Sequence, residues 1–173
     1  MSNGEGEGEG EGEGEGLTAY NDLASWALAT LRDTDAVCDL VVGGDDGVIE
    51  TGQLTSQMLQ AAQATRREDE ECASQVLAIL VWDLGESGDV RERVASFAVL
   101  VYDRGKGYAN IRGAREAVVQ ALVGQNVLLV RGAMVPSVRF DGRSGHWNVE
   151  EFDIDAERVN FSGRLVAELD EYM

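Results

Sequence analysis

Lysine, histidine and cysteine are scarce in this chain of 173 residues, and long apolar runs are missing. Lys106 is the only lysine, beside thirteen arginines, and His146 is the only histidine. Cys38 and Cys72 have no histidine or second cysteine at metal-ligand spacing, so we expect buried free thiols and no zinc site or disulfide framework. No apolar run reaches the roughly 18 residues that cross a bilayer. We therefore expect no metal and no membrane partner.

Acidic residues dominate what is present. The chain has 32 Asp and Glu residues against 14 Lys and Arg, a formal net charge of −18. An acid excess with almost no lysine keeps a surface hydrated in molar salt, where the Debye length is only ~3 Å. We interpret the composition as that of a halophile, haloarchaeal or a virus of such a host; the alternative is an ordinary acidic mesophilic protein. The charge also predicts no specific nucleic-acid partner, because phosphate binding requires clustered bases.

Six Glu-Gly repeats occupy residues 5–16. Glycine has the largest backbone entropy and the glutamates repel one another, so we expect a disordered arm over residues 1–16. The rest of the chain, 17–173, is long enough for a single domain with an ordinary core. The start of the chain lacks the basic-then-apolar order of a signal peptide, which predicts assembly in a cytoplasm.

Apolar periodicity predicts an α+β domain with a mainly antiparallel sheet, flanked by an N-terminal helix and a central helix. Helices are expected from Leu17 or Thr18 to Arg32, over 55–67 and over 111–123, the last with Asn110 as its N-cap and Gly124 after its end. A charged run, 66–71, is expected to be a solvated helix end or loop. Strands are expected over 75–83 and 95–103 as a hairpin with a long loop at 85–89, and over 126–132, 135–140 and 146–166 as a C-terminal β-meander with a hairpin turn at 141–145.

The two hairpin strands are apolar on both faces. Val76, Leu80 and Trp82 share one face of the first strand, while Leu77 and Ile79 share the other. Antiparallel strands that meet water on one side alternate apolar with polar residues instead. Both faces must therefore be covered, one by the helices at 17–32 and 111–123, and the other by a further helix or a neighbouring subunit.

The turn Arg104-Gly105-Lys106-Gly107 joins an apolar strand to a helix, and such glycine turns can hold phosphate. A phosphate-binding loop requires four residues before Gly-Lys-Ser/Thr, and Lys106 is followed here by Gly107 and Tyr108. A dinucleotide fingerprint requires GxGxxG, which fails at Asn110. A nucleotide-dependent enzyme using residues 104–107 remains an alternative only, and we expect no cofactor.

Catalytic groups are also sparse. His146 would need a paired nucleophile, and alternation along a strand separates it from Ser144. It is therefore expected to be an exposed turn histidine. The acid pairs at 150–151 and 153–155 are typical of solvent-facing strands rather than of a general acid and base in a cleft. We expect no enzyme.

Bases gather at one corner of this acidic chain. Arg104, Lys106, Arg112 and Arg115 fall within twelve residues, with Tyr108 among them. We take these five residues as a candidate subunit or partner interface. One hypothesis is that this corner meets an acidic surface on an identical neighbour, as in a head-to-tail ring. The alternative is a locally neutralising patch without a partner.

The order of elements, from about Leu17 to Leu169, resembles the tail terminator (tail-completion) proteins of long-tailed viruses. The resemblance rests on FAVLVYDRGKGYANIRGAREAVVQAL, which looks like the family's segment after its second long strand, and on 138–143 with 159–165, which look like its closing strands. The Glu-Gly arm and the polar insert at 66–71 depart from the family's pattern.

The resemblance implies a non-enzymatic virion protein that forms a ring, in the family a hexamer. Such a ring caps the tail tube and joins it to the head connector, so the implied partners are further copies of the chain, the tail tube protein and the head–tail connector protein. The alternatives are a head–tail connector or adaptor subunit, and a cellular halophilic scaffold or regulatory domain that works as a dimer.

Overall fold

The computed structural model describes residues 18–50, 52–68, 72–89, 91–104, 108–130, 132–149 and 154–167. The predicted arm over 1–16 lies outside these residues. The elements, in chain order, are β2 (Ala19–Tyr20), α2 (Leu23–Arg32), α3 (Asp35–Cys38), the 3-10 helix η1 (Gly44–Gly47), β3 (Val48–Glu50), α4 (Ser56–Glu68), β4 (Ala78–Gly88), β5 (Arg93–Arg104), α5 (Tyr108–Leu122), β6 (Val127–Leu129), β7 (Ala133–Val135), β8 (Arg139–Val149), β9 (Ile154–Arg164) and β10 (Val166–Ala167).

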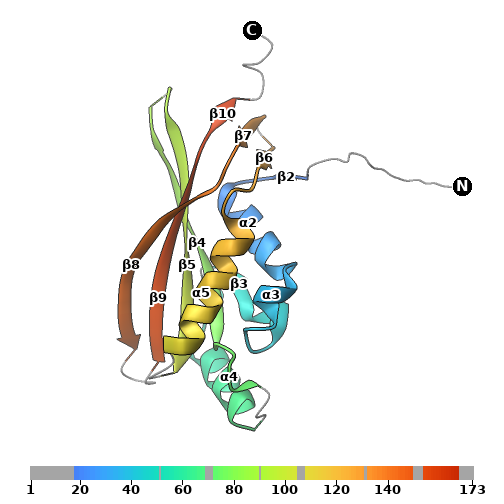
Figure 1. Cartoon of the computed structure of the whole chain (residues 1–173), viewed down its shortest axis with the longest axis vertical. Helices are drawn as coiled ribbons and strands as arrows, with labels where there is room; N and C mark the ends of the chain where they lie inside the picture. The colour runs from blue at the N-terminus through green and yellow to red at the C-terminus, as the bar shows by residue number, and fades with distance from the viewer. Residues whose placement is uncertain are drawn as a thin grey trace, which may run out of the picture.

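These elements form two sheets and confirm the α+β class. The large sheet has the strand order β3-β4-β5-β9-β8, and the small sheet has the order β10-β7-β6-β2. Most neighbours are antiparallel, as predicted, but β3 pairs with β4 and β2 with β6 in parallel. Figure 1 shows the long strands side by side, with α2 and α5 packed against one face of the large sheet and α4 at its lower end.

Helix α2 begins later than the sequence predicts. Ala19 and Tyr20 pair with Leu128 and Leu129 of β6 and so belong to a strand. The Oδ1 atom of Asp22 then accepts a hydrogen bond from the backbone N–H of Ser25 at 2.7 Å, which is an N-cap. The expected start at Leu17 or Thr18 is therefore wrong, because sheet pairing takes the residues before the cap.

The core lies between α2, α5 and the inner face of the large sheet. Phe97 of β5 stacks on Phe161 of β9, with ring centroids 5.1 Å apart. Trp26 of α2 meets Phe97 edge-on at 6.5 Å. The predicted apolar stripe of the central helix is buried on the same core at Ile111, Ala114, Val118 and Leu122. Aromatic pairs in these geometries add about 0.5–1.5 kcal/mol to the stability that burial provides.

In the described part of the chain, the outer face of the large sheet is covered in its lower half, and the chain itself supplies that cover. Leu59 of α4 packs against Leu77, Ala78 and Ile154. A second cluster beside it consists of Ile49, Leu80, Ala98 and Leu100, with Leu54 and Tyr102 packed against them. The prediction that both faces need cover is confirmed for this half, where α4 is the further helix.

Two predicted turns are strand instead. Residues 85–88 continue β4, where Glu86 pairs with Ala95, and the pairing shifts at a bulge between Asp83 and Gly85. The expected turn at 141–145 lies inside β8, which pairs with β9 through two register shifts. Glycine at positive φ, as at Gly85 and Gly142, supports bulges as readily as turns. Residues 150–153, which connect β8 to β9, lie outside the described residues.

The ends of α5 show one wrong and one confirmed prediction. The helix begins at Tyr108, so Asn110 lies inside it and is not the N-cap. Its side-chain amide donates to the carbonyl of Ala73 at 3.1 Å instead. Gly124 follows the helix with φ +82, the left-handed conformation expected after a helix end.

Candidate assembly surfaces

The structure describes four of the five residues of the predicted interface. Arg104 ends β5 and is exposed, Arg112 is exposed on α5, and Tyr108 is the first residue of α5. Lys106 lies outside the described residues. Arg115 points towards the sheet and is largely buried, because it forms an ion pair there. Nothing in the structure tests whether these residues form an interface, and that assignment stays a prediction.

Arg115 and Arg143 hold one buried carboxylate between them. Arg115 Nη1 lies 2.7 Å from Glu157 Oε1, and Arg143 Nη1 lies 3.3 Å from Glu157 Oε2. The side chain of Glu157 is 6 % exposed. A carboxylate buried so far requires paired donors, so the cluster fixes α5 to β8 and β9. The sequence did not reveal Glu157 or Arg143, since their partners lie 14 to 42 positions away.

An open groove lies where α5 passes β8. It has a volume of about 390 Å³ and is lined by Arg115, Glu116, Val119, Gln120 and Phe140. The ring of Phe140 is 39 % exposed, and its centroid lies 5.8 Å from that of Phe161 in the core. Arg139 stands beside Phe140 in β8 with a side chain that is 71 % exposed. The groove therefore combines an apolar floor with a charged rim.

Strand β8 also has an open edge. It is the last strand of its sheet, pairing with β9 on one side and with no other strand in the part of the chain that the structure describes. An uncovered edge of 11 residues presents backbone donors and acceptors to another chain. Arg139 and Arg143 on this strand set its charge. The groove and the edge are therefore neighbouring parts of one surface.

The upper end of the β4–β5 hairpin forms an exposed arm, which we define as residues 82–89 and 91–94. The strands run past the helices at the top of Figure 1. Residues 82–88 are all exposed, in contrast to the buried residues 78–81 of the same strand. Trp82 carries the guanidinium of Arg158 over its ring at 4.8 Å, and Leu84 is 37 % exposed. Cation–π contacts at exposed sites are weak, on the order of 0.5–1 kcal/mol, so this contact adds little to the burial of Trp82.

Acids gather around α3 and η1, far from the groove. Residues 18–50 contain seven Asp and Glu and one base, Arg32. The exposed ones near α3 and η1 are Asp33, Asp35, Asp39, Asp45 and Asp46, which we call the acidic surface. Burial raises the pKa of the Cys38 thiol, and the charges of Asp45, Asp35, Asp39 and Asp33 raise it further, which places these carboxylates around one point. Cys38 is free and half-buried rather than buried as predicted.

A second buried acid holds α4 in place. The side chain of Asp103 at the end of β5 is fully buried and pairs with Arg66 of α4. Burial raises the pKa of Asp103, against the opposing effect of hydrogen bonds from Arg66, the Arg104 backbone and Asn110. Arg66 also donates to the carbonyl of Gln75 at 2.7 Å. The expectation of a solvated run at 66–71 is therefore wrong for Arg66, because it has a buried partner 37 positions away.

The described residues give little support to metal binding, nucleotide binding or catalysis. The residues that the structure describes contain no group of three or more His, Cys, Asp and Glu that could hold a metal ion. Helix α5 leads from β5 in the large sheet to β6 in the small one, which is not the βαβ unit of a dinucleotide site. His146 lies within β8 rather than at a turn. Outside the described residues lie Gly105, Lys106 and Gly107, and the acids 150, 151 and 153. Within the described residues, no helix is long and apolar enough to cross a membrane.

Comparison with known proteins bears on the fold. No protein-family model matches the chain, and no curated protein matches it. Among solved structures, the chain is similar to one in "Virion of native gene transfer agent (GTA) particle", with a TM-score of 0.57 and 19 % sequence identity. The match covers 83 % of this chain and 94 % of that chain. At this identity the likeness shows a shared fold over almost the whole of a virion subunit.

Proposed function

We propose that the chain is a structural subunit of a tailed-virus particle, and specifically a tail terminator whose copies form a ring. The observation that carries the proposal is the shared fold with a subunit of a virus-like particle, which spans 94 % of that subunit. In this role the ring caps the finished tail tube and connects it to the head. The subunit performs no chemistry of its own.

The exposed surfaces support a protein that works by contact with other chains. The large sheet has an open edge along β8, and its hairpin arm extends beyond the helices that cover the rest. An open groove with an exposed phenyl ring lies beside that edge. Open edges and exposed apolar side chains are costly for a monomer and are typical of subunits that complete their packing in an assembly.

The mass of the purified full-length chain in molar KCl tests the ring. Light scattering after size exclusion is expected to give one closed oligomer, and electron microscopy is expected to show annular particles. A stable dimer would favour the cellular scaffold alternative. A monomer at every protein concentration would overturn the proposal.

Binding to polymerised tail tubes then separates the terminator from the head–tail connector alternative. A terminator is expected to appear at one end of the tubes in micrographs and to stop their elongation. A connector or adaptor subunit is expected to leave the tubes unchanged and to bind the isolated head connector ring. Bovine serum albumin, an acidic protein without this fold, provides the control for non-specific attachment to tubes.

A further inference from the structure

We propose that copies of this chain associate head to tail through two surfaces of opposite charge. One is the arginine groove, which we define as Arg115 and Phe140 of the groove lining together with Arg112, Arg139 and Arg143 on the same two elements, and whose lining also contains Glu116; the other is the acidic surface around α3 and η1. The inference rests on the proposed ring and identifies which faces meet in it. It replaces the corner predicted from the sequence, since the structure ties Arg115 to the sheet and brings β8 beside it.

The guanidinium groups of the arginine groove stay partly exposed although most of them are paired within the chain. Glu157 takes up Arg115 and Arg143 together, yet the side chain of Arg143 remains 58 % exposed. Arg139 Nε lies 3.1 Å from Asp141 Oδ1, and Arg139 is still 71 % exposed. Arg112 is exposed on the same helix as Arg115. Guanidinium groups fixed at one end and open at the other are suited to carboxylates of a second molecule.

The acidic surface carries the complementary negative charge, and the elements that present it are anchored in the core. Its aspartates lie at the end of α2, on α3 and on η1, and they surround Cys38 closely enough to raise the pKa of its thiol. The elements beneath are anchored by fully buried Leu31, Val37 and Val41. Arg32 is the only base among residues 18–50, and its Nε donates to the carbonyl of Val48 at 2.8 Å. The surface therefore keeps a strongly negative charge.

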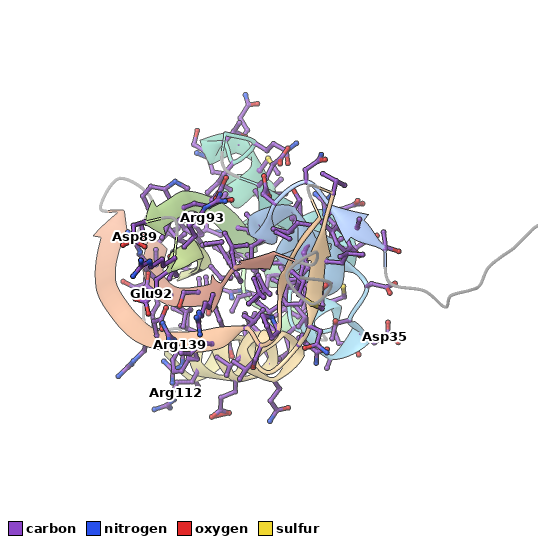
Figure 2. All side chains as sticks on the ribbon, turned by 90° about the horizontal axis from the view of Figure 1, so that it is seen from above. Asp35, Asp89, Glu92, Arg93, Arg112 and Arg139 are labelled. Atoms are coloured by element: carbon purple, nitrogen blue, oxygen red, sulfur yellow. The ribbon has the colours of Figure 1, made fainter. Side chains whose placement is uncertain are left out.

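The two surfaces lie on opposite sides of the molecule. Figure 2 shows Asp35 on one side of the fold, with Arg112 and Arg139 on the other. Figure 1 shows the same separation, because β8 and α3 lie on opposite flanks of the large sheet and its helices. Two different faces, placed apart on each copy, can bind a neighbour on both sides at once. This is the requirement of a heterologous contact, which forms a ring when its rotation closes.

Charge also decides between a head-to-tail contact and a two-fold one. A two-fold contact would place one acidic surface against another, or one arginine groove against another, and like charges in contact repel. The head-to-tail contact pairs unlike charges. Molar salt screens interactions beyond about 3 Å, so these pairs act at contact distance and select the partner rather than attract it from afar. The exposed ring of Phe140 supplies apolar area to the contact, which salt does not weaken.

Charge reversal tests the pairing in the full-length chain. One variant carries Arg112→Glu and Arg139→Glu, and a second carries Asp33→Arg, Asp39→Arg and Asp46→Arg; all five side chains are exposed, so both variants are expected to fold. Each variant alone is expected to lose the oligomer. In the first variant the arginine groove becomes acidic, because Glu116, Asp141 and Glu157 then outweigh the remaining arginines. In the second variant the acidic surface becomes basic, so the two faces of each variant carry the same charge sign. A one-to-one mixture is expected to regain the oligomer, since reversed and natural faces become complementary in alternation. The chain that carries all five changes is expected to assemble by itself.

Matched controls make each result decisive. The variant Arg67→Glu with Arg91→Glu changes the net charge by the same amount as the first variant, on exposed residues outside both surfaces, and it is expected to keep the oligomer. Circular dichroism checks that every variant is folded. If the wild type forms a ring and the reversed variants also do so, or if the mixture stays dissociated, the pairing is overturned while the proposed function stands. If the wild type is a monomer, both are overturned.

Discussion

The two halves of the β4–β5 hairpin share one ladder of backbone pairing. They differ in burial, because the β4 side chains are buried in the lower half and exposed in the upper half. In the lower half, Ile79, Val81 and Val99 are buried in one cluster with residues of α2, α5 and β9. In the upper half, residues 82–88 are exposed although they pair with β5 in the same way. Pairing alone therefore does not place a strand in the core. The lower half therefore belongs to the core, whereas the upper half leaves its β4 side chains exposed.

The ion pairs at the two ends of β5 show the same difference. Asp103 in the lower half pairs with Arg66 and is fully buried. Arg93 in the upper half pairs with Glu86, with side chains that are 47 % and 25 % exposed. A buried charge that loses its partner is costly, whereas an exposed pair contributes little. The predictions below use this contrast, from the largest expected effect to the smallest.

Truncation of Phe97 should produce the largest loss. Phe97→Ala removes a ring that touches both Trp26 and Phe161 at the centre of the core, and we expect about 4 kcal/mol less free energy of unfolding. Leu84→Ala in the arm should cost below about 1 kcal/mol, because its side chain is already partly in water. Urea unfolding in molar KCl, followed by circular dichroism, measures both. Similar losses at the two positions would refute the division into core and arm.

Removal of Arg66 should come next. Arg66→Met keeps the length of the side chain but leaves Asp103 buried without its guanidinium partner, and we expect a loss of about 3 kcal/mol. The double variant with Asp103→Asn should recover part of this loss, since the uncompensated charge is then gone. Urea unfolding of both variants measures the recovery. A single variant as stable as the wild type would show that the pair does not hold α4.

The pH dependence of stability should follow from Asp103. Burial raises its pKa above the ordinary 3.8, so the folded protein binds this proton more readily than the unfolded chain does. As pH rises from the unfolded value through the higher folded one, this contribution to the free energy of unfolding is lost. Asp103→Asn does not titrate, so the stability of the wild type relative to the variant should fall with rising pH across that window and then level off.

Urea unfolding of wild type and Asp103→Asn at a series of pH values measures this difference. Because both chains carry the same other carboxylates, the difference isolates Asp103. A difference that rises with pH would mean that Arg66 dominates and holds the pKa below 3.8.

Removal of Arg93 should have the smallest effect. Arg93→Met breaks the exposed pair with Glu86, and we expect below about 1 kcal/mol in the free energy of unfolding. The matched comparison is Arg66→Met, which makes the same chemical change at the opposite end of β5. Thermal unfolding in the same buffer ranks the two variants. A loss at Arg93 equal to that at Arg66 would show that the arm contributes to the fold.

The sequence predicted the parts of the fold that depend on local pattern. The helix over 55–67, the apolar stripe of α5 and the two central strands follow from periodicity, which neighbouring residues carry by themselves. Gly124 was recognisable as a helix end because few other residues adopt its backbone conformation. The need to cover both faces of the hairpin strands also followed from alternation alone.

The sequence did not predict the parts that depend on distant partners. By local pattern Ala19 and Tyr20 resemble the start of a helix. They form a strand because they pair with β6, which lies more than a hundred positions later in the sequence. Gly142 and Gly145 look like a turn, yet β9 holds them in a bulged strand. Glu157 looks like a solvent-facing acid until α5 brings Arg115 over it. The arginine groove consists of such long-range contacts, so the bases of α5 and β8 could not be joined from the sequence.

Electron microscopy of the wild-type assembly in molar KCl tests the central claim most directly. We predict annular class averages with cyclic symmetry, in which the edge of β8 on each copy faces α3 of the next. Two-fold dimers in which like faces meet, or single copies at every protein concentration, would contradict the account.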